Sequence, residues 1–484
     1  MAVNQEKVLA WFWLIIWAKT PLWAGLSINY ALSEVFLLKK LIFCNFSVHI
    51  CNLGGILLFY GIIMYDFFKG RLVFVRITLL VAALALVAIG IAAIYSVGHP
   101  AETSPASKAE NLAHYWQKQV QYAVVGLLAF IAVNMVSYRR FGALSYWLYA
   151  IVLLLLAVLL LGKIVNIPFV PEINGTHSWI IITIAGRKLP SIQPSEICKL
   201  AYVLALAWYL RYRKNYRNFS ALIGPFALTL LPMVLILLEP DLGTVLLMMP
   251  ILFTMLFVAG AKVKHLLIVI LLAILTSPLL WHFMKDYQRT RISSVLLQSE
   301  WVRKEAEKNP KLTEILVGHR NRKYKTFADQ WESDWGYHLI RSKFAVASGG
   351  AAGYGFRNGP FIKYDFLWAR HNDFIFATIA HQWGFVGSVI VLGLYVIIIG
   401  CGLEIAGHNI DPFGRLLAVG IVSMFTVEVL VNVGMTVGLM PITGLTLPLV
   451  SYGGSSLLVS MASVGLLNNI GRRRLFTVAP KTFE

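Results

Sequence analysis

Residues 221–259 read ALIGPFALTLLPMVLILL, EPDLGT and VLLMMPILFTMLFVA, that is, two uncharged stretches around a short acidic break. The stretches, 221–238 and 245–259, consist almost entirely of hydrocarbon side chains. A helix needs roughly 20 apolar residues to cross a bilayer, so each stretch predicts a membrane-spanning helix. A carboxylate at the rim of a bilayer is costly unless it is hydrated or paired. Asp241, in the break, is therefore the first candidate for chemistry.

The composition extends this interpretation to the whole chain. Of its 484 residues, 58% are hydrophobic and 13% are charged, and the mean hydropathy is +0.71. Soluble domains carry about 25% charged residues. The apolar runs are continuous, as in 151–161, whereas a transmembrane β-barrel alternates apolar and polar residues. The sequence predicts an all-α polytopic membrane protein.

Hydropathy predicts about ten transmembrane helices. These are 74–97, 119–137, 144–162, 192–210, 219–238, 243–260, 264–284, 374–402, 413–438 and 450–470. Two more apolar segments, 8–30 and 47–67, form an N-terminal membrane hairpin or lie at the interface. The expected domains are an extension over 1–70, a transmembrane domain over 71–474 and a cytoplasmic tail over 475–484.

The net charge of +19 fits the excess of Lys and Arg in cytoplasmic loops. Basic clusters at 139–140, 211–217, 262–264 and 472–474 fall on one side of the predicted spans. The Asp241 turn then faces the opposite, extracytoplasmic side. Basic loops suit anionic lipids, and we do not expect nucleic acid as a partner.

A large extracytoplasmic loop is expected over 285–373. Its part 300–335 is strongly charged, and either a short helical hairpin or a flexible insertion would explain it. The four cysteines form no C-x-x-C pair, so the sequence predicts neither a disulfide framework nor a zinc site.

Asp241 has two compatible interpretations. It follows a proline and opens an apolar run, which is typical of a helix N-cap. Its carboxylate could also act as a general base that takes a proton from a sugar hydroxyl. Both roles hold if one oxygen caps the helix and the other faces a cavity.

Several other polar residues lie at the ends of spans. Glu196 and Lys199 share a helix face and form either an intramembrane ion pair or a headgroup site. Lys118 is an interfacial anchor or a diphosphate contact. Arg289 and Arg291 clamp phosphate or belong to a solvated face.

Two further segments contain candidate site residues. Asp373 suits an N-cap and, with His371, could help to position a divalent cation. The segment 441–456 is rich in proline and glycine, which break helices. It is either a loop or a re-entrant wall of a binding cavity, because non-helical backbone at membrane depth is tolerated there.

Five motifs in order resemble the SEDS (shape, elongation, division and sporulation) family of RodA- and FtsW-like proteins. They are Gln193-Pro194-Ser195-Glu196 with Lys199, Glu239 to Thr244, Gly336-Tyr337-His338 through Gly350, Arg370 to Ala377, and Gly444 to Pro448 with Ser451 to Ser456. Asp286 to Arg289 and the pair Arg370-His371 look more like RodA, whereas Gly444 to Pro448 looks more like FtsW.

The resemblance implies a ten-span inverting glycosyltransferase that polymerises lipid II into β-1,4-linked glycan and releases undecaprenyl diphosphate, with Asp241 as the catalytic aspartate. It further implies a divalent cation (Mg²⁺ or Mn²⁺), a class B penicillin-binding protein as partner, and work within the bacterial elongation machinery of the inner membrane. We expect substrate contacts from Lys118, Trp179, Glu196, Lys199, Arg289, Arg291, Lys343, Arg370, His371 and Ser451, and a metal contact from Asp373.

The chain departs from the family pattern in four places. Ser178 stands where an arginine is frequent, His381-Gln382 replaces an acidic pair, 300–335 is longer than usual, and 1–70 lies outside the resemblance. The alternative functions are a lipid II flippase and a non-catalytic scaffold of the cell-wall synthesis complex.

Overall fold

The computed structural model describes residues 71–101, 112–165, 167–173, 176–181, 183–184, 187–188, 191–212, 219–317, 326–364, 366–367 and 369–472. The chain divides at Gly70 into two units, and the predictions for 1–70 and for the tail 475–484 lie outside the described residues.

Each of the ten apolar segments predicted as a span contains a long helix. These are α3 (Arg71–Gly98), α5 (Tyr115–Met135), α6 (Tyr138–Leu161), α7 (Pro194–Leu210), α8 (Ile223–Leu238), α9 (Leu242–Val258), α10 (Val263–Phe283), α17 (Ile375–His408), α18 (Pro412–Thr436) and α19 (Gly454–Arg472). Six described helices are long and apolar enough to cross a membrane by themselves. The all-α membrane fold is confirmed, and the count of ten spans stays a prediction.

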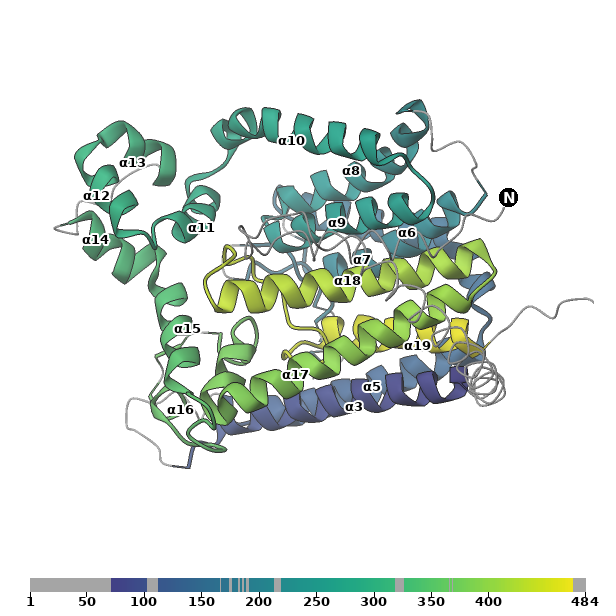
Figure 1. Ribbon diagram of the computed structural model, residues 1–484, viewed down its shortest axis with the longest axis horizontal. Helices are drawn as coiled ribbons and strands as arrows, with labels where there is room; N and C mark the ends of the chain where they lie inside the picture. The colour runs from purple at the N-terminus through teal and green to yellow at the C-terminus, as the bar shows by residue number, and fades with distance from the viewer. Residues whose placement is uncertain are drawn as a thin grey trace, which may run out of the picture. The chain divides into compact units, whose positions relative to one another are not determined.

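The remaining described elements are short. They are β1 (Thr183–Ile184), β2 (Arg187–Lys188), η1 (Phe219–Leu222), α11 (Asp286–Leu296), α12 (Glu300–Lys308), α13 (Pro310–Val317), α14 (Phe327–Gln330), the π-helical turn η2 (Trp331–Trp335), α15 (Tyr337–Ser348) and α16 (Pro360–Lys363). β1 and β2 pair antiparallel, Thr183 opposite Lys188. Helices α11 to α16 gather at one end of the long-helix bundle (Figure 1).

Helix α18 forms the centre of the bundle and packs against α7, α9 and α17 (Figure 1). Its most apolar window is 78% buried, compared with 17% for α5 at the periphery. A Cβ at Gly420 would come within 2.6 Å of Val203 on α7 and 2.8 Å of Met255 on α9. The absence of a side chain at Gly420 therefore lets three helix backbones approach closely. Helix α10, by contrast, exposes most of its apolar side chains, as expected of a surface that faces lipid tails.

The segment 300–335 is helical where it is described, which favours the hairpin over the flexible insertion. Helices α12 and α13 meet at Asn309, whose Oδ1 accepts the backbone N–H of Lys311 at 3.1 Å. They surround a small apolar core to which Ala306, Leu316 and Trp331 contribute. Such a core explains why a strongly charged sequence folds here.

The segment between α18 and α19 has no helix in the structure, as its prolines and glycines predict. Leu445, Leu447 and Val450 in it are buried. Because its backbone polar groups bond within the protein, as in Ser451 N–H to Leu447 O at 2.9 Å, it can lie at membrane depth. This agrees with the interpretation of the segment as a wall inside the protein rather than a surface loop.

Candidate active site

Asp241 is the N-cap of α9. Its Oδ1 accepts the backbone N–H of Thr244 at 3.1 Å, and its Oδ2 accepts the Thr244 hydroxyl at 2.9 Å. The sequence predicts that one oxygen caps the helix and the other faces a cavity, and the structure shows that both oxygens bond to Thr244. Each carboxylate oxygen has two lone pairs, so each can still accept another hydrogen bond. Thr244 thus holds the carboxylate in one orientation.

Glu239 lies two residues before Asp241 and is 1% exposed. Neither oxygen of its carboxyl group has a hydrogen-bond partner among the described residues, while its backbone oxygen accepts the Ser178 hydroxyl at 3.3 Å. Burial and the neighbouring charge of Asp241 raise the pKa of Glu239 to about 8, against the opposing effect of Lys163. Glu239 is therefore mostly neutral at pH 7, next to an aspartate in a different environment.

Asp373 is brought to α9 by the segment 443–445. A Cβ at Gly243 would lie 2.9 Å from the backbone oxygen of Thr443, and a Cβ at Gly444 would lie 3.8 Å from Asp373 Oδ2. Gly444 has φ +78°, a conformation that glycine adopts without strain. The Asn432 side-chain amide donates to the backbone oxygens of Asp373, at 2.9 Å, and of Leu445, at 2.7 Å. This amide fastens the two chain segments to α18.

Asp241, Asp373 and Arg291 form one electrostatic group. Burial and the charge of Asp241 raise the pKa of Asp373 to about 6, and the Arg291 guanidinium acts in the opposite direction. Beside them is a cavity of about 110 Å³ between α9, α11 and 441–443, with Arg291 as its only charged lining residue among the described ones. The cavity is apolar with one cation, and its lining residue Leu242 directly follows Asp241. Such a cavity suits a lipid that carries an anionic head.

His371 and Lys118 lie in an aromatic group adjoining this site. The rings of Tyr115 and Tyr452 stack with centroids 4.7 Å apart, and the His371 ring meets both edge-on, at 5.1 and 5.7 Å. Lys118 Nζ lies 5.7 Å from the centre of the Tyr115 ring. His371 is two residues from Asp373, so this aromatic group continues the wall of the site.

Ser451 connects the aromatic group to the non-helical segment. Its hydroxyl donates to the backbone oxygen of Asn372 at 2.7 Å and accepts the N–H of Leu447 at 2.8 Å. The Gln119 side chain donates to Ser451 O at 3.1 Å. Both Ser451 hydrogen bonds are with backbone, so Ser451 shapes the wall.

Glu196 and Lys199 lie in a different place, inside the helix bundle. Lys199 Nζ is 2.8 Å from Glu196 Oε2 and 2.6 Å from Glu428 Oε1, and all three side chains are buried. We call these three residues the ion cluster. Because the Lys199 ammonium is enclosed by two carboxylates, the geometry supports the alternative in which the pair fixes helix packing.

Three further predicted substrate contacts have partners elsewhere in the protein. Arg289 donates to the carbonyls of Trp281 and His282 at the end of α10, at 3.1 and 2.8 Å. Arg370 is buried and donates to Phe361 O at 3.2 Å. Lys343 donates to Gln298 in the large loop at 2.8 Å.

Trp179 is half-buried and follows Ser178, which contacts Glu239. Of the predicted arginines, the structure brings Arg291 close to Asp373.

The oxygen ligands that a magnesium ion prefers are present near Asp373. The described residues hold no group of three His, Cys, Asp or Glu. However, Asn372 Oδ1 is buried with no hydrogen-bond partner in the described structure, and Asn372 directly precedes Asp373 in the sequence. An amide oxygen and a carboxylate fit a Mg²⁺ ion whose other ligands are water and phosphate.

The sequence reasoning missed Tyr115, Tyr452, Asn432 and the burial of Glu239. No sequence signal shows that Tyr115 and Tyr452, which are 337 positions apart, stack. The burial of Glu239 without a partner could have been predicted, because a glutamate at the end of an uncharged span has few polar side chains near it.

The chain matches the family model FtsW/RodA/SpoVE, described as cell cycle proteins, over residues 76–305 and 311–475. It is 35% identical to the peptidoglycan glycosyltransferase RodA of Treponema pallidum, across 82% of this chain and 97% of the relative. It is 32% identical to the peptidoglycan glycosyltransferase MrdB of Escherichia coli K12, across 74% and 86% of the two chains.

Solved structures of similar proteins match this chain as well. A chain of a peptidoglycan synthase complex that coordinates polymerization and crosslinking matches with TM-score 0.60 and 30% identity, over 81% of this chain and 96% of that one. The rod shape determining protein RodA of Thermus thermophilus matches with TM-score 0.53 and 29% identity, over 82% and 96%. The chain therefore belongs to the FtsW/RodA/SpoVE family of membrane proteins.

Proposed function

We propose that this protein is a peptidoglycan glycosyltransferase that polymerises lipid II and releases undecaprenyl diphosphate in cell elongation. The observation that carries the proposal is the Asp241 carboxylate, oriented by Thr244 and directly before Leu242, which lines an apolar cavity together with Arg291. The curated names of relatives that align over most of their length support the same activity.

In the proposed reaction Asp241 is the general base. Its carboxylate takes the proton from the 4-hydroxyl of a GlcNAc unit as that oxygen attacks the anomeric carbon of a MurNAc diphosphate. The new C–O bond forms as the bond to the diphosphate breaks, and the α-linkage of the donor becomes a β-1,4 linkage. A base held by two hydrogen bonds needs little reorganisation before it accepts the proton.

Arg291 and the apolar cavity suit the departing group. A guanidinium at this position offsets the charge that develops on the diphosphate. The lining from α9 and 441–443, with Leu242, Val245 and Ile442, is apolar enough for the first part of a lipid chain. In the proposed complex the lipid lies against α9 and the sugar lies toward Asp241.

A divalent cation would be held by Asp373 and the Asn372 amide oxygen, together with diphosphate and water. When bound, the cation neutralises diphosphate charge. Asp373 would contribute a carboxylate ligand to that cation. Its neighbour Gly444 leaves room beside Asp373 Oδ2.

We further propose a class B penicillin-binding protein as partner and the extracytoplasmic face of the bacterial inner membrane as the place of reaction. The match to a chain of a peptidoglycan synthase complex supports a crosslinking partner. The basic clusters on the other side of the spans support the orientation.

The test is polymerisation of labelled lipid II by the purified protein with its class B partner and Mg²⁺. We expect a ladder of glycan strands that lysozyme digests. Flipping of labelled lipid II in liposomes without any ladder would support the flippase instead. Absence of both, while a known polymerase works in the same assay, would support the scaffold.

A further inference from the structure

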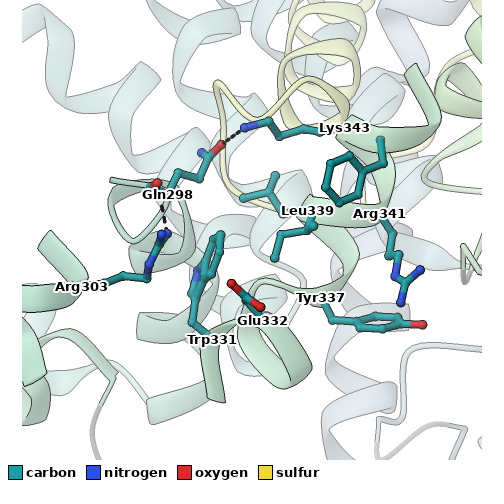
Figure 2. A pocket seen from close by; sticks show the side chains of 10 residues that line it. Gln298, Arg303, Trp331, Glu332, Tyr337, Leu339, Arg341 and Lys343 are labelled. Atoms are coloured by element: carbon teal, nitrogen blue, oxygen red, sulfur yellow. Dashed lines mark hydrogen bonds between the residues drawn. The ribbon is translucent and has the colours of Figure 1, made fainter. Parts of the chain in front are cut away.

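The large loop contains a second cavity, of about 520 Å³, separate from the one at Asp241 (Figure 2). Its lining combines three aromatic rings, three cations and one carboxylate. Cavities of about 300–1,000 Å³ are typical of small-molecule sites. We call it the loop pocket, and define it by Arg303, Trp331, Glu332, Tyr337, Arg341 and Lys343.

The cations of the loop pocket are held in place by rings and carbonyls. The Arg303 guanidinium lies 4.5 Å from the Trp331 ring centre and donates to Leu297 O at 2.7 Å. The Arg341 guanidinium lies 5.1 Å from the Tyr337 ring and 5.3 Å from the Phe366 ring. An arginine stacked on an aromatic face keeps its N–H edge available for a carboxylate.

Lys343 completes the cationic side. Its ammonium donates to Gln298 Oε1 at 2.8 Å, as Figure 2 shows. An ammonium has three N–H donors, so it can bind a further acceptor. Gln298 is itself fixed, because its side-chain amide donates to Gly438 O at 2.7 Å. The geometry is thus set before any ligand arrives.

The lining favours an acidic ligand that also carries polar groups, sugar rings or amide groups. Arg303, Arg341 and Lys343 against Glu332 leave two positive charges in excess. The half-buried Tyr337 ring is of the kind that packs on sugars and peptide bonds, and the exposed Glu332 can accept an amine. A phosphate alone would need neither the ring nor the carboxylate, whereas an acidic peptide on a sugar uses both.

The loop pocket and the Asp241 cavity share two chain segments. Arg291 lines the Asp241 cavity and Gln298 lines the loop pocket, seven positions further along α11 and its C-terminal turn. Seven residues span roughly 10 Å of helix. Residues 441–443 line the first cavity, and Gly438 bonds to Gln298 in the second. One glycopeptide of ordinary length can reach from one cavity to the other.

We propose that the loop pocket binds the acidic peptide carried by the sugar substrate, while the sugar diphosphate binds at Asp241. This inference rests on the proposed function, and it assigns a peptide-recognition role to residues of the large loop. Arg341 and Lys343 bind peptide carboxylates, and Tyr337 packs on the peptide or its sugar.

The test uses a soluble disaccharide-peptide fragment that lacks lipid and diphosphate, added to the purified full-length protein, with binding measured by calorimetry. We expect the fragment to bind at least about tenfold more tightly than the same disaccharide without peptide, since each charge-assisted hydrogen bond contributes on the order of one tenfold step. The double substitution Arg341→Gln with Lys343→Gln should remove this difference, whereas Lys343→Arg should keep it.

The matched control is Lys304→Gln, since Lys304 is an exposed lysine of the same loop that pairs with Glu300 at 2.8 Å outside the pocket. Equal binding of fragment and peptide-free sugar, or unchanged binding in a double variant with an unchanged thermal midpoint, would overturn the proposal. A third outcome is that the wild type does not bind the fragment and the double variant no longer binds the class B partner. The pocket would then be a protein contact, and the proposal would also be overturned. Because the fragment cannot be polymerised, a failed polymerisation assay contradicts the proposed function separately.

Discussion

Two regions of this protein hold carboxylates away from water, and they do so in opposite ways. In the ion cluster, Glu196 and Glu428 lie 2.8 and 2.6 Å from the Lys199 ammonium. Beside Asp241, the Glu239 carboxyl has no hydrogen-bond partner among the described residues, and the pKa values of Glu239 and Asp373 are raised. Paired charges stabilise packing, whereas carboxyl groups held without an ammonium partner have shifted proton affinity and suit proton transfer.

The largest effect should come from breaking the ion cluster. Lys199→Met leaves two buried carboxylates without their cation, which costs about 3–5 kcal/mol of unfolding free energy. Chemical unfolding in detergent measures the loss, and Lys199→Arg, which keeps the charge, should lose less. An unchanged unfolding midpoint in Lys199→Met would show that the cluster does not stabilise the bundle.

Substitution of Glu239 should raise the free energy of unfolding, whereas substitution of Lys199 lowers it. Its folded pKa of about 8 lies above the ordinary value of 4.5, so the folded state binds more protons between these values and stability falls as pH rises through this window. Glu239→Gln stays neutral and should be more stable than wild type at pH 8, by roughly 2–4 kcal/mol.

At pH 4 the Glu239→Gln variant and the wild type should be equally stable, because the glutamate is then protonated in both states. The measurement is the thermal midpoint of both proteins from pH 4 to 9. Parallel curves for the two proteins would contradict a raised pKa at Glu239.

The protonation of Asp373 should affect the rate of polymerisation. Its pKa of about 6 predicts that polymerisation slows as pH falls through that value, by about tenfold per pH unit, if the ionised form is needed. Asp373→Asn should lower the rate by roughly 10–100-fold and lose this acidic limb. Rates from pH 4.5 to 8 measure both. A variant that keeps the wild-type acidic limb would assign the limb to another group.

The smallest effect is expected from Thr244→Val. It removes the hydroxyl bond to Asp241 Oδ2 and keeps the backbone N–H bond to Oδ1. The rate should fall by less than about tenfold, because one neutral-donor hydrogen bond contributes roughly 0.5–1.5 kcal/mol. Initial rates at saturating lipid II check this, and a 100-fold loss would mean that the hydroxyl has a direct part in the reaction.

The helices were predictable because each apolar run is about as long as a span. The N-cap role of Asp241 and the non-helical segment before α19 also followed from local residue types. The partner of Lys199 was not predictable, since Glu428 lies 229 residues away. Nor did the sequence show that Arg289 bonds to the end of α10, because loop arginines look alike until the backbone places them.

We propose that Asp241 contributes its charge to catalysis and only its shape to the fold. The direct test compares wild type and Asp241→Asn in one preparation, for lipid II polymerisation and for thermal midpoint. Asparagine caps helices as well as aspartate does but cannot take a proton. We therefore predict a rate loss of at least about 100-fold with an unchanged midpoint. Glycan ladders at the wild-type rate from a stable Asp241→Asn protein would contradict the assignment of Asp241 as the base.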